Sequence, residues 1–158
     1  MKRDQNLVTL SWEHHDGLVV AFRLQQGLKK NLAIEDLTRY ILFTWEEVLQ
    51  RHFWQEEQVI QPRLTDKRDG RAALDRMMND HDRFRKLIAA LKEDPSESEQ
   101  VTAFIDMLNN HIRFEERELF PLLEKRCRPE ELSKIGDFLR KHHLSACADY
   151  PHKFWQKS

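Results

Sequence analysis

Residues 52–64, HFWQEEQVIQPRL, and residues 111–123, HIRFEERELFPLL, repeat one pattern within this 158-residue sequence. Each stretch begins with a His, carries a Glu pair four and five positions later, and ends with a Pro and a Leu at matching positions. Apolar residues recur around both stretches at spacings of three and four, which is typical of one face of an α-helix. The repeat therefore predicts two similar helices, each with a His and a Glu one turn apart on the same face.

Working outward from the repeat, the spacing of apolar residues predicts five helices. A first helix is expected from Ser11, a good N-cap, to about Lys30, with His15, Leu18 and Phe22 on its inner stripe. The next three helices carry longer stripes, which comprise Ile41, Trp45, Val48, His52, Glu56 and Val59; then Leu74, Met77, His81, Phe84, Ile88 and Leu91; then Val101, Phe104, Leu108, His111, Glu115, Glu118 and Leu122. We expect Pro62 to end or bend the second helix and Pro121 to kink or tighten the fourth.

The connections between these helices are short and polar. Residues 65–70, TDKRDG, read as one loop, and residues 94–98, DPSES, as another. A shorter fifth helix is expected after Pro129, to about residue 148, and an irregular tail follows from Tyr150. The pattern predicts an all-α fold, an up-down four-helix bundle with a short additional C-terminal helix. We expect a single domain over 1–158, with the bundle core at about 11–127 and the accessory helix at about 129–148.

The apolar residues of the fifth helix have two interpretations. Ile135, Phe138 and Leu139 are expected to dock on the bundle, and a dimer interface is the alternative. The chain is therefore expected to be a monomer or a homodimer.

Composition excludes several classes of function. The formal net charge is −1, so no basic excess points to nucleic acid. No apolar run is long enough to span a bilayer, and the N-terminal residues lack the apolar stretch of a signal peptide. A cytoplasmic protein without nucleic acid or membrane partners is the expectation. The two cysteines are too few for a disulfide framework.

The repeated His and Glu residues interrupt stripes that are otherwise apolar. Lone carboxylates that face a core are costly, and buried charges need partners or a metal ion. Imidazole with carboxylate suits iron, manganese or zinc, and bundle cores hold di-metal sites of this kind. The alternative is that each HxxxE pair lies on the surface and contributes about 0.2–0.5 kcal/mol. Four inward His, one per helix, together with two Glu in a duplicated context favour the metal site.

With these residues the chain resembles the hemerythrin-like, or HHE cation-binding, family over about residues 8–125. The resemblance rests on residues 10–18, LSWEHHDGL; on residues 79–82, NDHD; and on the two HxxxE motifs, the second followed by LFP at residues 119–121. It implies a hemerythrin-like bundle in which four His and two bridging carboxylates bind two iron ions, with zinc or manganese as alternatives. Carried over by position, the metal ligands are His15, His52, Glu56, His81, His111 and Glu115.

Two further residues stay open as ligands. His14 is the alternative to His15, which is preferred because Leu18 follows it at +3. Glu118 follows Glu115 by one turn and adds a donor if it turns inward; otherwise it is a rim carboxylate paired with Arg or Lys. Members that carry oxygen have a second His one turn before the third-helix ligand, and here that position is Met77.

The sequence leaves three functional hypotheses. The first is a di-iron protein that binds or senses O2, NO or iron, because the expected ligands leave coordination positions for a small molecule. The second is a di-iron enzyme that acts on peroxide or NO or in iron–sulfur cluster repair. The third is a metal-free helical interaction module.

Overall fold

The computed structural model describes residues 2–65, 68–143 and 149–156. Within these ranges the chain forms helices and no strand. The helical segments in chain order are α1 (Val8–Lys29), α2 (Ile34–Thr44), η1 (Trp45–Leu49), α3 (Gln50–Leu64), α4 (Arg68–Glu93), α5 (Ser98–Phe114), η2 (Glu115–Leu119), α6 (Phe120–Arg126) and α7 (Pro129–His142). Both η segments are single π-helical turns inside longer helices, so α2–η1–α3 and α5–η2–α6 are each continuous. The predicted five helices and the all-α class are confirmed.

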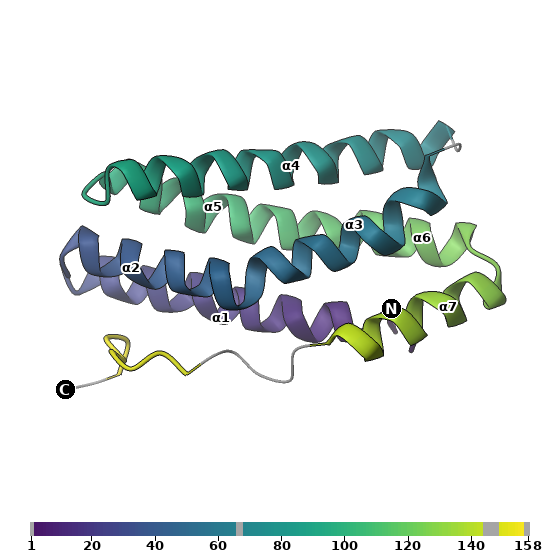
Figure 1. Ribbon diagram of the computed structural model, residues 1–158, viewed down its shortest axis with the longest axis horizontal. Coiled ribbons are helices and arrows are strands. Elements are labelled where there is room, and N and C mark those ends of the chain that lie inside the picture. The colour runs from purple at the N-terminus through teal and green to yellow at the C-terminus, as the bar shows by residue number, and fades with distance from the viewer. Residues whose placement is uncertain (1, 66–67, 144–148, 157–158) are drawn as a thin grey trace.

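The four long helices run alternately up and down (Figure 1). In the bundle, α1 packs against α5 and α2, while α4 packs against α3 and α5. The close approach of α1 to α5 is set by Gly17, where an added Cβ would lie 2.9 Å from Cδ1 of Ile112. This glycine brings the two helices together close to the functional residues described below.

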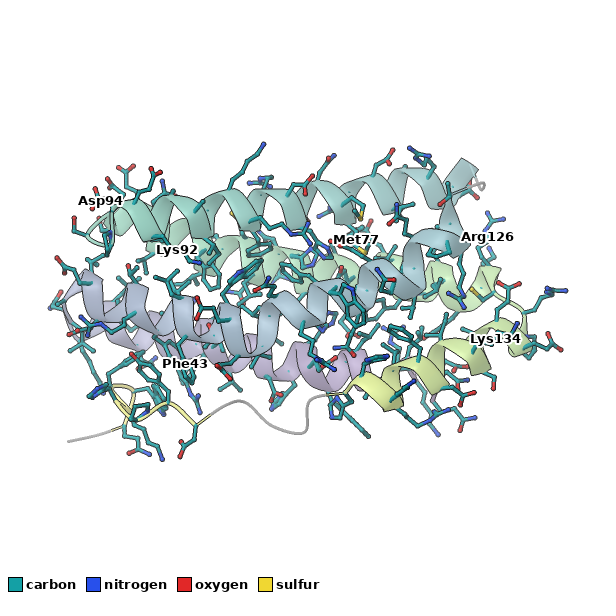
Figure 2. The ribbon with its side chains drawn as sticks, viewed as in Figure 1. Phe43, Met77, Lys92, Asp94, Arg126 and Lys134 are labelled. Carbon is teal, nitrogen blue, oxygen red and sulfur yellow. The ribbon has the colours of Figure 1, made fainter. Side chains whose placement is uncertain are left out.

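The interior is divided into two apolar clusters. One cluster is centred on Leu24, Tyr40, Phe84 and Phe104. The other holds Leu10, Ile60, Met77, Phe120 and Leu123. Side chains fill the space between the helices along the whole bundle, and Met77 projects from α4 (Figure 2).

A layer of buried polar side chains separates the two clusters. On α1 it lies between Leu10 and Leu24, and on α4 between Met77 and Phe84. Polar groups cost free energy in such a place unless they are satisfied. The position of this layer is what the fold provides for function.

The predicted stripes of the second, third and fourth helices are buried at every position except two. Leu122 is partly exposed and Glu118 is exposed. The stripe predicted for the first helix is wrong, because Leu18 and Phe22 are 43% and 59% exposed. The buried face of α1 carries Leu10, Gly17 and Leu24 instead.

Several predicted boundaries also differ from the structure. Ser11 is not an N-cap, since α1 begins at Val8 and the Ser11 hydroxyl donates to Oε1 of Glu116. The loop expected at 65–70 is shorter, because α4 already begins at Arg68. Pro62 lies inside α3, which continues to Leu64. Pro121 does not tighten its helix; it follows the wide π turn η2.

The C-terminal helix docks on the bundle as expected. Ile135 and Leu139 of α7 are fully buried in the second cluster, and Phe138 packs against it. The predicted end near residue 148 falls outside the described residues, and α7 ends at His142. Residues 150–156 of the tail are irregular, and Tyr150 is buried against the ring of Tyr40. None of the described helices is long and apolar enough to cross a bilayer.

Candidate metal centre

Six buried side chains from the four long helices form the polar layer. α1 supplies His14, α3 supplies His52 and Glu56, α4 supplies His81, and α5–η2 supplies His111 and Glu115. None of the six is more than 4% exposed. Helical spacing explains the pairs on α3 and at the α5–η2 junction, because residues four apart share a face. The two HxxxE motifs therefore meet in the interior, as the sequence predicts.

The six side chains form two overlapping groups of four, and in each group one ligand atom per residue lies within 4.8 Å of the others. The first group holds His14 and His52, and the second holds His81 and His111. Both groups contain Glu56 and Glu115. Each group thus offers two imidazole nitrogens and two carboxylate oxygens around one point.

The two carboxylates each present one oxygen to either group. Oε1 of Glu56 is 2.9 Å from Nε2 of His52, and its Oε2 is 3.2 Å from Nε2 of His81. Oε2 of Glu115 is 3.0 Å from Nε2 of His14, and its Oε1 is 3.1 Å from Nε2 of His111. Two carboxylates placed in this way would be suited to bridge a pair of ions.

The inward atoms fit a metal better than they fit one another. Buried atoms without a hydrogen bond include Nε2 of His52, His81 and His111, Oε2 of Glu56 and Oε1 of Glu115. Several of these atoms lie close to a carboxylate or imidazole of the other kind, but the angles between them are not those of hydrogen bonds. Their lone pairs converge on shared points, as the ligands of a cation do. Buried unsatisfied groups are costly, and cations bound at the two groups would satisfy them.

The outward nitrogen of each histidine meets a second carboxylate on the neighbouring helix. The pairs run once around the bundle: His52 with Glu13 at 3.3 Å, His81 with Glu57 at 2.8 Å, His111 with Asp80 at 3.1 Å, and His14 with Glu116 at 2.7 Å. An ionised carboxylate only accepts, so each Nδ1 carries the proton and donates it. The lone pair of a neutral ring then lies on Nε2, which faces the centre. Such partners fix the tautomer and orientation of metal-binding histidines.

Aromatic stacking holds two of the rings further. The ring of Phe53 stacks on His81 with centroids 4.1 Å apart and planes at 6°. Phe120 stacks on His14 at 5.1 Å and 4°. Phe53 belongs to one apolar cluster and Phe120 to the other, so a ring packs on the layer from each side.

The electrostatics show how the histidines behave without a cation. Burial alone lowers the pKa of His52, but Glu56 and Glu13 outweigh it and raise that pKa to about 9. Burial likewise opposes the charged form of His111, and Glu115 together with a hydrogen bond to Asp80 raises its pKa to about 9. Without a cation, the imidazoles of His52 and His111 therefore favour the protonated form at neutral pH.

The pKa of Glu116, the partner of His14, shifts in the opposite direction. Burial raises the pKa of Glu116, but hydrogen bonds with His14, Ser11 and Arg3 outweigh this and lower it to about 2. Burial also opposes the charge of His14, whose pKa is nevertheless raised well above its usual value by Glu115 and Glu116. His14 and Glu116 thus form an ion pair that connects a partly exposed carboxylate with the centre.

The structure favours the alternative, His14, over His15 as the residue of the first helix that reaches the centre. His15 is exposed, whereas His14 is 3% exposed and belongs to the first group. Since the inner face of α1 runs through Gly17, the residue at +3 from the inward His is the glycine. Leu18, which supported His15, lies on the exposed face.

Glu118 and Met77 do not enter the centre. The Glu118 side chain is 64% exposed and lies 3.8 Å from Arg76, which is the rim pairing given as the alternative. The π turn at Glu115–Leu119 explains this, because a wider turn rotates Glu118 off the stripe that an α-helix would continue. Met77 is fully buried in an apolar cluster, one turn before His81.

The four second carboxylates were not identified from the sequence. Each adjoins an inward residue in the chain: Glu13 precedes His14, Glu57 follows Glu56, Asp80 precedes His81, and Glu116 follows Glu115. Because each acts on the next helix, the spacing within one helix does not reveal it. An acid next to one inward residue on each of the four long helices was the available signal. Glu13 also accepts from Nε2 of Gln55 at 3.1 Å.

Comparison with known proteins agrees with this geometry. The family model described as "Hemerythrin HHE cation binding domain" matches residues 6–123. Searches of curated proteins and of solved structures gave no match. The matched range contains all six side chains of the polar layer, and family and clusters together indicate metal binding. The chain therefore belongs to the hemerythrin HHE cation-binding family.

Proposed function

We propose that this protein is a non-haem di-iron protein that binds O2, NO or another small ligand at the metals. The observation that carries the proposal is the pair of four-residue groups, each with two histidines, that share the carboxylates of Glu56 and Glu115. Each group supplies four protein donor atoms, two fewer than the roughly six that iron prefers. The remaining positions would be available to a small ligand.

Iron is proposed because nitrogen and carboxylate oxygen are a ligand set that suits it. Zinc and manganese accept similar donors, so metal identity is part of the test. The bound ions would supply Lewis acidity and electrons to the ligand. The chain's own residues orient the four rings and keep each proton on Nδ1, and Phe53 and Phe120 stack on two of the rings.

A metal-free interaction module is less well supported. It leaves five inward nitrogen and oxygen atoms of the polar layer buried without hydrogen bonds. An enzyme would need an acid or base beside the ligands, and Glu118, which could have supplied an inward carboxylate, is exposed. We therefore favour ligand binding over turnover.

The test is anaerobic loading with iron(II), followed by exposure to O2 and separately to NO, with absorption spectra recorded. We expect new visible or near-ultraviolet bands with each gas, from a protein that holds about two irons per chain. Glu115→Gln should lose most of the change, because both groups use its charge. Glu118→Gln is the matched control from the same π turn and should behave as the wild type. An iron-loaded wild type that shows no spectral response to either gas contradicts the proposal.

A further inference from the structure

A cleft lies between α4 and α5–η2, directly outside one half of the metal centre. Its volume is about 570 Å³. Its inner wall includes His111 and Asp80, and its rim carries Arg76, Arg83, Arg113 and Arg117. The cleft therefore joins the solvent to the outer side of a residue that we assign to the metals.

The cleft has an excess of positive charge. Its lining holds the four arginines against three carboxylates, Asp80, Asp106 and Glu118. Two of these acids are already engaged: Asp80 with Nδ1 of His111 at 3.1 Å, and Glu118 with Arg76 at 3.8 Å.

Two guanidinium groups are left for a ligand. Arg113 and Arg117 are exposed, and neither has an ion pair with any part of the chain that the structure describes. They are four residues apart, at the junction of α5 and η2. Arg76 is already oriented, since its guanidinium carbon lies 4.0 Å from the centroid of the Phe114 ring.

The size and chemistry of the cleft indicate the ligand class. Pockets for small organic molecules occupy roughly 300–1,000 Å³, whereas a water-sized molecule takes about 30 Å³. Guanidinium forks match carboxylate and phosphate groups in two-point contacts. We propose that this cleft binds a small organic anion that carries carboxylate or phosphate groups, beside His111.

The cleft is also connected to the metal centre, through Arg83 and Asp80. Nη1 of Arg83 is 3.6 Å from Oδ1 of Asp80, whose other oxygen holds His111. An anion that engages Arg83 weakens its pull on Asp80 and changes the hydrogen bond to His111. This effect on the metals rests on the proposed function, but binding of the anion does not.

The experiment titrates metal-free protein with succinate and, separately, glycerol 3-phosphate by calorimetry at constant ionic strength. Constant ionic strength matters because exposed charges are screened by salt. We expect saturable binding of at least one anion, and Arg113→Gln/Arg117→Gln should weaken it by about tenfold or more, since charge-assisted contacts are lost. The preferred anion distinguishes a carboxylate ligand from a phosphate ester. The control Arg71→Gln removes an exposed arginine of α4 that pairs with Asp75 and does not line the cleft, and this variant should bind as the wild type.

Several outcomes overturn the proposal. One is no saturable binding of either anion by the wild type, and another is unchanged binding by the double variant. Equal weakening by Arg71→Gln also overturns it, because the attraction is then unspecific. Thermal melts of each variant confirm that the fold is intact. Since the protein carries no metal in this assay, its failure leaves the gas-binding test standing, and the reverse also holds.

Discussion

Replacement of His14 and of its neighbour His15 separates the two assignments of the first-helix ligand. Nε2 of His14 lies 3.0 Å from Glu115 and 3.3 Å from Glu56, whereas His15 is exposed. His14→Gln removes one of the four donors from the first group and none from the group of His81 and His111. We therefore expect the metal content to fall from about two ions per chain to about one, and His15→Gln to leave it unchanged.

The size of the metal-dependent rise in Tm follows from the linkage between metal binding and folding. An ion at a hundred times its dissociation constant stabilises the native state by about 2.7 kcal/mol, so two ions give about 5 kcal/mol. For a chain of 158 residues, each kcal/mol raises Tm by about 2–4 °C. The metal-dependent rise should be about 10–20 °C in the wild type and in His15→Gln, and about half of that in His14→Gln.

The assay is elemental analysis together with melts recorded with and without added metal. The metal-free melt of each variant removes any direct effect on folding, such as the lost stacking of His14 on Phe120. Full metal content in His14→Gln, with loss in His15→Gln, refutes the assignment.

Three further predictions test other parts of the account. Asp80→Asn should weaken metal binding by about 10–100-fold, measured by chelator competition, because the carboxylate that orients His111 loses its charge. Phe104→Ala removes a fully buried ring and should cost about 3–5 kcal/mol in denaturant unfolding, while metal content stays unchanged. The raised pKa values of His52 and His111, about 9 each, stabilise the metal-free fold below about pH 6.5, and this contribution is lost as pH rises through 9. The lowered pKa of Glu116, about 2, adds stability that is present above about pH 4.5 and is lost as pH falls through 2, so melts across pH should show a maximum between these limits.

The sequence predicted the second, third and fourth helices well because each has a long amphipathic stripe. His52, His81 and His111 continue rows of apolar residues, and the burial of those rows confirms them. Spacing within one helix was sufficient for these residues, since each reaches the centre from its own stripe.

The prediction for the first helix failed for a physical reason. Its inner face contains Gly17, whose missing side chain allows α1 and α5 to approach, so the position that should show an apolar residue shows none. The apolar Leu18 at +3 then favoured His15. In the structure the inward His of the first helix and that of the third each follow an acid, as Glu13-His14 and Asp80-His81.

Features that depend on neighbouring helices could not be predicted from one helix at a time. A helical pattern of 3.6 residues per turn does not predict the π turn that rotates Glu118 outward. The carboxylates behind the histidines act across helices, and the arginine cleft is formed by two helices together. Only the packed bundle defines these sites.

Anomalous diffraction from crystals of the metal-loaded protein tests the central claim most directly. The account predicts two peaks about 3.5–4 Å apart between Glu56 and Glu115, one beside His14 and His52 and the other beside His81 and His111. A polar layer without anomalous density, or metal bound at His15 on the surface, would contradict it.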